Sequence, residues 1–265
     1  MKKGKSRSIF ISFIMLGVVA LAGSVFVTSV MAASPQDAIS AAVGSQEELV
    51  GKARDTVASF HFDPGLQWFH EHVKEAKAVF ILPEVYEGAF IIGASGGEAV
   101  FLVQDKNSGL WSNPAFYEAR SVSLGLKVGG QKSEVVAMVM TDKAVKAFME
   151  GGFKLGADLK VAIGPGSATA ATPSGDLITF GRSKGLILGA SLIGANISID
   201  AEANEAYYKQ SVTPKDIVLK KSVENAQSIP LRVGITESAK KPQTGIMTQE
   251  KEKEAGKREA IGDEH

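Results

Sequence analysis

His70, Glu71 and His72 are the residues of this sequence whose types come closest to those of a metal site. Two histidines bind zinc from one helix when they lie four residues apart, because that spacing puts them on the same face. His70 and His72 are two apart and point to different sides of a helix. We therefore expect a solvated helix face and no metal. The chain has no cysteine, so thiolate ligands and disulfides are also excluded.

The sequence also lacks the motifs that a serine nucleophile and a nucleotide-binding loop usually require. In the region expected to fold, a serine has only His61, His70 and His72 as candidate bases, and the chain has no Gly-x-Ser-x-Gly segment. Residues 93–97 and 164–167 are rich in glycine, but neither segment continues into the Gly-Lys-Ser/Thr of a phosphate loop. Turns and bulges explain these glycines better. We expect no enzymatic activity and no cofactor.

Two groups of side chains favour the binding of lipid instead. Arg182 and Lys184 flank a serine in a glycine-bounded segment, where two cations can bind a phosphate diester, although an ordinary exposed turn is the alternative. The second group combines aromatic rings suited to headgroup depth with lysines that reach lipid phosphate, and core packing of Phe69 is the alternative there. This group consists of Trp68, Phe69, Lys74 and Lys77.

The two ends of the chain predict export and a polar tail. Basic residues at the start precede an uncharged stretch, 9–30, and small residues follow at the positions that a signal peptidase inspects. We interpret 1–32 as a signal peptide, and an uncleaved anchor stays open because the stretch is long enough to span a membrane. Residues from Ser34 onward are then periplasmic or extracellular. Residues 222–265 are expected to form a polar, disordered tail.

The charge balance gives no reason to expect nucleic acid as a partner. The chain has 29 basic and 29 acidic residues, so it is formally neutral. Removal of residues 1–32 takes away basic residues only and leaves an acidic excess, whereas a nucleic-acid surface is basic.

Residues 34–221 predict one α+β domain. Ser34 and Pro35 have the types that begin a helix, and apolar residues recur every three or four positions to about residue 60. A short helix follows Asp63, and later helices are expected at 142–149, 201–210 and 213–219. Between them, apolar runs separated by turn residues predict a β-rich curved sheet, sandwich or barrel. These strands are expected at 78–82, 89–92, 99–103, 116–119, 122–128, 135–140, 155–163, 177–180, 186–188 and 195–199.

Several short blocks recur through this region in a fixed order and spacing. They are 76–79 with Pro83, Trp111-Ser112-Asn113-Pro114-Ala115-Phe116, Gly129-Gly130-Gln131, 153–158, 164–166, 183–186, 189–192, 203–208 and Thr213-Pro214-Lys215-Asp216-Ile217. In this order and spacing they resemble the SYLF domain, a family found as an exported module in bacteria and beside other modules in eukaryotes. The resemblance covers about residues 57–219, and it implies a barrel-like, β-rich domain with N-terminal helices and a short C-terminal helix.

The resemblance implies lipid binding without a reaction. Eukaryotic members bind phosphoinositides, with a basic amphipathic helix near the domain start implicated, and some bind actin. Here the helix expected at 35–60 is not basic, because Lys52 and Arg54 are outnumbered by acidic residues. We therefore expect an envelope phospholipid as ligand, and a structural or protein-interaction module of the envelope is the alternative. Actin is not expected as a partner, because an exported protein does not meet cytosolic actin.

Overall fold

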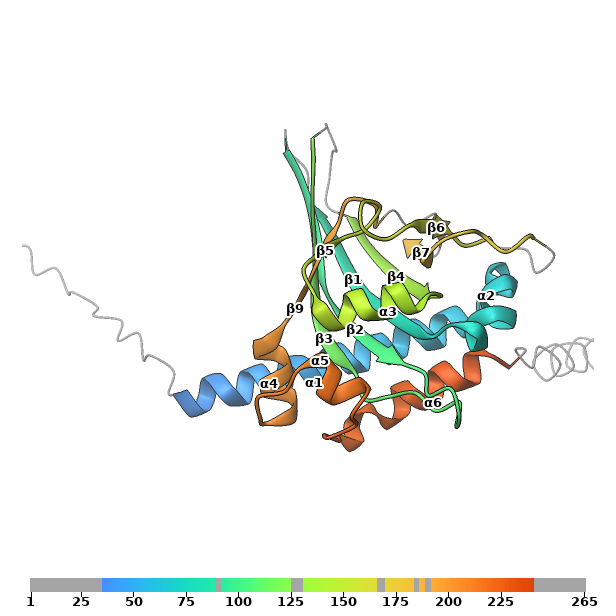
Figure 1. Ribbon diagram of the computed structural model, residues 1–265. Coiled ribbons are helices and arrows are strands. Elements are labelled where there is room, and N and C mark those ends of the chain that lie inside the picture. The colour runs from blue at the N-terminus through green and yellow to red at the C-terminus, as the bar shows by residue number, and fades with distance from the viewer. Residues whose placement is uncertain are drawn as a thin grey trace, which may run out of the picture.

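The computed structural model describes residues 35–88, 92–124, 131–165, 170–183, 186–188 and 192–240. In this part of the chain a strongly curved sheet lies between one helix on one side and a pair of helices on the other (Figure 1). The single helix is α3 (Asp142–Glu150), and the pair is α1 (Pro35–His61) and α6 (Ile229–Ser238). This is the α+β architecture with N-terminal helices that the sequence predicts.

Nine strands of the described residues form the sheet. Along it the strands follow the order β5-β9-β3-β2-β1-β4-β7-β6, and β8 pairs with β7. Strands β6 and β7 run parallel, whereas the other pairs are antiparallel. The bounds are β1 (Ala78–Gly88), β2 (Ile92–Val103), β3 (Ala115–Leu124), β4 (Gln131–Val139), β5 (Phe153–Lys154), β6 (Val161–Ile163), β7 (Leu177–Ser183), β8 (Leu186–Leu188) and β9 (Asn196–Ile199).

The connection between the two outermost strands explains why the sheet curves. Strands β5 and β6 stand at opposite ends of the strand order, yet only residues 155–160 join them. So short a connection spans at most about 25 Å. Eight flat strands about 4.8 Å apart would place the two edges about 34 Å from each other. The sheet must therefore curl, which gives it the barrel-like shape expected from its glycines.

The core fills both sides of this curved sheet. On one side, Phe148 of α3 stacks on Phe101 of β2, with ring centroids 4.3 Å apart, and also contacts Phe80 and Tyr117. On the other side, α1 contacts β1 and β2 through its apolar stripe. The buried residues of that stripe are Leu49, Val50, Ala53, Val57 and Phe60.

Local sequence signals explain several helix ends. Thr141 caps α3 by accepting a hydrogen bond from the backbone N–H of Ala144. Gly151 ends the helix with a φ of 70°, a conformation that suits glycine. Thr213 and Asp216 form a capping box at the start of α5 (Pro214–Val218). The helix expected at 201–210 is α4 (Ala201–Tyr208), which Asp200 caps.

Pro83 does not end the first strand as the sequence suggested. Strand β1 continues to Gly88, and its pairing with β4 shifts register between Leu82 and Val85. A bulge accepts proline because the missing N–H is not needed for the strand ladder there. Gly97 of β2 fits the same irregularity, since a Cβ on it would lie 2.1 Å from the carbonyl oxygen of Glu84.

The single strand expected at 155–163 is also wrong. Only β5 and β6, on either side of residues 155–160, are strands. Gly156 has a φ of 86°, and the carboxylate of Asp158 accepts a hydrogen bond from the N–H of Lys154, so the segment turns. Of the other expected strands, residues 89–91 and 125–128 lie outside the described residues.

The folded domain extends beyond the boundary expected at residue 221. Residues 222–240 contain η3 (Ala226–Ser228) and α6, and Leu231 and Ile235 are buried where α6 contacts α1. The carbonyl oxygen of Val223 and the hydroxyl of Ser228 both hydrogen-bond the buried side chain of Asn113. The polar-tail expectation therefore fails for 222–240, and residues 241–265 lie outside the described residues.

Among the described residues, no helix combines the length and the apolar character that crossing a bilayer requires. The expected signal peptide or anchor, 1–32, lies outside them.

Candidate functional site

The two aromatic residues expected at a membrane surface lie in the core. Trp68 and Phe69 belong to the short helix α2 (Gln67–His72), which follows η1 (Pro64–Leu66) and precedes η2 (Val73–Glu75). Both side chains are fully buried, and both rings contact Phe180 of β7. A membrane cannot reach them in this conformation, so the alternative of core packing holds.

The histidines beside them are held by backbone carbonyl groups. His70 is buried, with Nε2 2.8 Å from the carbonyl oxygen of Phe60. His72 stacks on the Trp68 ring, with centroids 3.9 Å apart. The expectation of a solvated face is therefore wrong for His70. Within the described ranges no group of three or more histidine, aspartate or glutamate side chains is placed to hold a metal ion.

Arg182 is an ion-pair partner inside the fold. It lies on β7 opposite Glu134 of β4, and its Nη2 and Nε are 2.6 and 3.1 Å from Glu134 Oε2. Its Nη1 donates to the carbonyl oxygen of Ser59, and its guanidinium lies 5.6 Å from the centre of the Phe60 ring. The exposed-loop interpretation is therefore wrong for Arg182. Lys184 lies outside the described residues.

The remaining two expected lipid contacts, Lys74 and Lys77, line different pockets. Lys74 is exposed at the edge of an open hollow of about 410 Å³ that also includes His72 and Ala239. Lys77 is half-buried, and its Nζ lies 2.6 Å from Asp142 Oδ2. The five of these residues that the structure describes thus do not form one surface, and a role of Lys74 or Lys77 in lipid binding stays a prediction.

The pocket around Lys77 has two more lysines on its rim. It measures about 290 Å³ and lies between the end of β2, the start of α3 and the end of α5. Its lining combines five charged side chains with four apolar ones. We call it the lysine pocket, and its lining consists of Lys77, Val103, Gln104, Asp105, Lys106, Asp142, Val145, Val218, Leu219 and Lys221.

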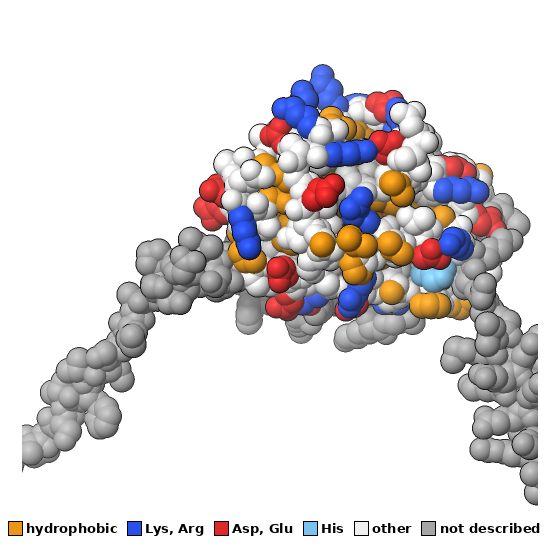
Figure 2. Space-filling view, turned by 90° about the horizontal axis from the view of Figure 1, so that it is seen from below, with side chains coloured by type: hydrophobic (Ala, Val, Ile, Leu, Met, Phe, Trp, Pro, Cys, Tyr) orange, Lys and Arg blue, Asp and Glu red, His pale blue; other side chains and the backbone are white. Residues whose placement is uncertain are grey.

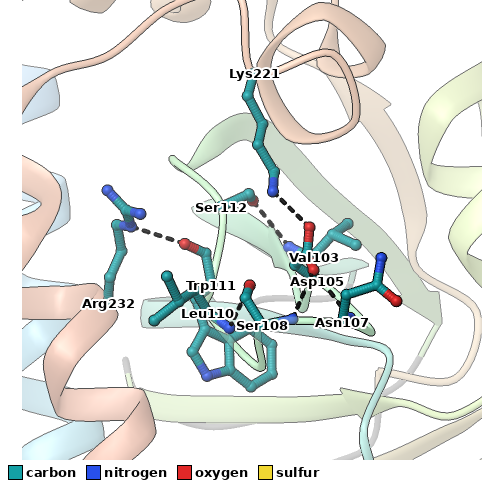
Figure 3. A network of polar contacts seen from close by, with 9 residues as sticks. All are labelled: Val103, Asp105, Asn107, Ser108, Leu110, Trp111, Ser112, Lys221 and Arg232. Carbon is teal, nitrogen blue, oxygen red and sulfur yellow. Dashed lines mark hydrogen bonds and ion pairs between the residues drawn. The ribbon is translucent and has the colours of Figure 1, made fainter.

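The loop after β2 is fixed from both sides. The Asp105 carboxylate accepts hydrogen bonds from the N–H groups of Asn107 and Ser108, and it binds Lys221 Nζ at 2.6 Å (Figure 3). At the other end of the loop, Nε of Arg232 in α6 donates to the carbonyl oxygen of Trp111 at 2.8 Å. These bonds connect the loop to α6 and to the segment after α5.

Large apolar side chains are exposed on the side of the molecule that carries α1 and α6. Figure 2 views this side and shows hydrophobic side chains grouped among scattered charges. Ile229 and Val233 lie one turn apart on α6 and are 50% and 52% exposed, and Leu110 is next to Trp111, which α6 binds. Phe62, just after α1, is 72% exposed. We call Ile229 and Val233, the exposed apolar pair on α6, the helical face.

Sequence reasoning missed this face because it assigned α6 to the tail. One helix signal was present, because proline takes the second position of residues 229–235, but the apolar residues there alternate as in a strand.

Comparison with known proteins identifies relatives. A family model described as "Ysc84: Las17-binding protein actin regulator" matches residues 120–237. SH3 domain-containing YSC84-like protein 1 of Homo sapiens is 31% identical over 162 residues, which are 59% of this chain and 47% of that protein. LAS seventeen-binding protein 3 of Saccharomyces cerevisiae is 30% identical over 154 residues, which are 55% of this chain and 33% of that protein. The chain thus spans less than half the length of these relatives.

These findings correct one expectation from the sequence. Actin was not expected as a partner because of the export signal. The family description names an actin regulator, and the yeast relative is named for binding Las17, so the exclusion of actin-pathway partners is wrong. The family description and the name of the yeast relative are those of binding proteins, not of enzymes.

Proposed function

The chain belongs to the Ysc84 (SYLF) family, and from that premise we propose that it is a non-catalytic module that binds actin filaments. The helical face is the surface by which it binds. The observation that carries this proposal is the exposure of Ile229 and Val233 on α6, inside the region that the family model matches.

Physical chemistry supports a protein contact on this face. Protein interfaces combine a central apolar patch with a polar rim, and the apolar patch supplies most of the binding free energy. On α6, Ile229 and Val233 supply the apolar part, and Glu237 and Lys240 supply exposed charges at the end of the helix. The buried side of the same helix is fixed against α1, so the exposed side chains are presented on a rigid support.

Co-sedimentation with actin filaments tests the proposal. We expect the chain of residues 33–265 to pellet with filaments in a saturable manner and to stay in the supernatant without them. Binding should persist when the salt concentration is raised, because an apolar contact is not screened. If the chain stays in the supernatant at every filament concentration, actin itself is not the partner.

A second candidate function is binding to phospholipid membranes, as the resemblance to lipid-binding domains implies. The observation that favours it is the exposure of Phe62 at the end of the molecule where Lys74 and Lys240 are also exposed. An aromatic ring beside lysines suits the headgroup region of a membrane. Export through residues 1–32 would place this surface at the cell envelope, periplasmic or extracellular, and an uncleaved segment 9–30 would anchor it there.

Liposome co-sedimentation across a salt series tests this second function. We expect binding to grow with the anionic lipid content and to weaken as salt rises, since exposed charges are screened. Phe62→Ser should weaken binding about tenfold, and Phe62→Trp should retain it. Equal binding of both variants would exclude Phe62 as a membrane contact.

Export is tested separately. Mass measurement of the mature N-terminus would decide whether residues 1–32 are removed.

A further inference from the structure

The lysine pocket contains more positively charged side chains than negatively charged ones. Lys77 and Lys106 share the carboxylate of Asp142, with Nζ to oxygen distances of 2.6 and 3.4 Å. Lys221 has Asp105 at 2.6 Å. Three ammonium groups therefore face two carboxylates, and one positive charge remains. Lys106 is the least engaged of the three, because its contact is the longest and its side chain is 72% exposed.

Both aspartates in the pocket are held in the charged form. The ammonium of Lys77 lowers the pKa of Asp142, and that of Lys221, with backbone N–H groups of the loop, lowers the pKa of Asp105. Their negative charges are therefore a fixed part of the site at neutral pH.

Lys221 has a backbone conformation that is unusual for lysine, and the ion pair of its side chain explains it. Lys221 follows the end of α5 with a φ of 52°, in the left-handed region where glycine is the usual residue. A lysine is strained there relative to its ordinary conformations. The same conformation places its ammonium on the rim of the pocket, against Asp105.

The walls and charges together define the chemistry of a ligand. The remaining single positive charge matches one carboxylate, which is also the group that these lysines already bind. A doubly charged phosphate would meet the carboxylates of Asp105 and Asp142 at close range, and like charges repel. Val145, Val218 and the half-exposed Leu219 provide an apolar surface beside the lysines. A carboxylate next to an apolar side chain satisfies both parts of the pocket.

We propose that the lysine pocket binds an acidic segment of a partner protein, with one glutamate or aspartate side chain at Lys106 and a neighbouring apolar side chain against Val218 and Leu219. This inference goes beyond the proposed function, because it assigns a second site made of other residues than the helical face. A volume of about 290 Å³ is enough for one or two side chains of such a segment.

Fluorescence anisotropy with a synthetic peptide tests this assignment on the full chain. The probe is a labelled heptapeptide with a central leucine flanked by glutamates, and its control has glutamines in place of the glutamates. We expect saturable binding of the glutamate peptide, weakened by salt, and at least about tenfold weaker binding of the glutamine peptide. Equal binding of the two peptides overturns the proposal.

Matched variants locate the site. Lys106→Glu should weaken peptide binding about tenfold or more, whereas Lys146→Glu, an equal change of charge on a side chain that is 74% exposed, should leave it within about twofold. Lys221→Gly removes the ammonium but suits the left-handed backbone, so it should weaken binding without unfolding the domain. Equal losses in Lys106→Glu and Lys146→Glu would show non-specific attraction and reject the pocket.

Two further experiments distinguish a carboxylate ligand from phosphate and distinguish this site from the helical face. Inorganic phosphate that displaces the peptide at concentrations where acetate does not would assign the pocket to phosphate and overturn the choice of carboxylate. Actin co-sedimentation of Lys106→Glu should equal that of the unchanged chain, so failure of the pocket and failure of the proposed function give different results.

Discussion

A chain that ends at residue 221 should lose cooperative unfolding, whereas a chain that ends at residue 240 should keep it. Residues 222–240 bury Val223, Leu231 and Ile235. Each such side chain contributes about 1.5–3 kcal/mol on burial, and the shortened chain also exposes the side of α1 that α6 covers. The sum approaches the entire free energy of unfolding of an ordinary domain, about 5–15 kcal/mol.

Circular dichroism during thermal unfolding measures this difference between residues 33–221 and residues 33–240. The longer chain keeps every described contact and serves as the control. If the two chains unfold at the same midpoint, α6 does not belong to the folding unit.

Replacement of Arg182 by alanine should destabilise the domain by about 2–3 kcal/mol, because it leaves a half-buried carboxylate without its partner. Arg182 joins three elements: Glu134 on β4, the carbonyl oxygen of Ser59 on α1, and its own strand β7. The Arg182 and Glu134 side chains are only 20% and 31% exposed, so water replaces the lost contacts poorly.

Urea denaturation measures this effect, with Arg120→Ala as the matched control. Arg120 also binds a glutamate at 2.7 Å, but its side chain is 72% exposed, and such pairs contribute about 0–1 kcal/mol. A double-mutant cycle with Glu134→Ala isolates the pair itself. Equal destabilisation by Arg182→Ala and Arg120→Ala would contradict a structural role of Arg182. The substitution Arg182→Glu would test Arg182 as a lipid contact only if the variant is shown to be folded.

The elements of this fold were more predictable than the contacts between them. The start of α1 at Pro35 and the start of α3 at Asp142 depend on neighbouring residues, and the sequence predicted both. The placement of β9 between β5 and β3 depends on which strands pair, and apolar periodicity does not encode a partner. The bulge at Pro83 escaped prediction for the same reason, since it requires the facing glycine on another strand.

The errors at the site have a related physical origin. A cation beside a glycine is typical of an exposed turn, but the register of β7 places Arg182 directly opposite Glu134. Trp68 and Phe69 are adjacent on one short helix, and both are buried because both rings contact Phe180 of β7, while Phe69 also contacts Phe60 of α1. Lys77 was marked as a candidate lipid contact, and that role stays a prediction. Its two companions in the pocket come from segments 29 and 144 residues further along the chain, which only the fold brings together.

The most direct measurement of the central claim compares two apolar-to-serine changes in actin co-sedimentation. One variant combines Ile229→Ser and Val233→Ser on the helical face, and the control is Ile163→Ser on β6, where the side chain is equally exposed at 53%. We predict at least about tenfold weaker binding for the α6 variant and unchanged binding for the control. Unchanged binding of both variants, in protein that unfolds at the normal temperature, would contradict the assignment of the helical face as the binding surface.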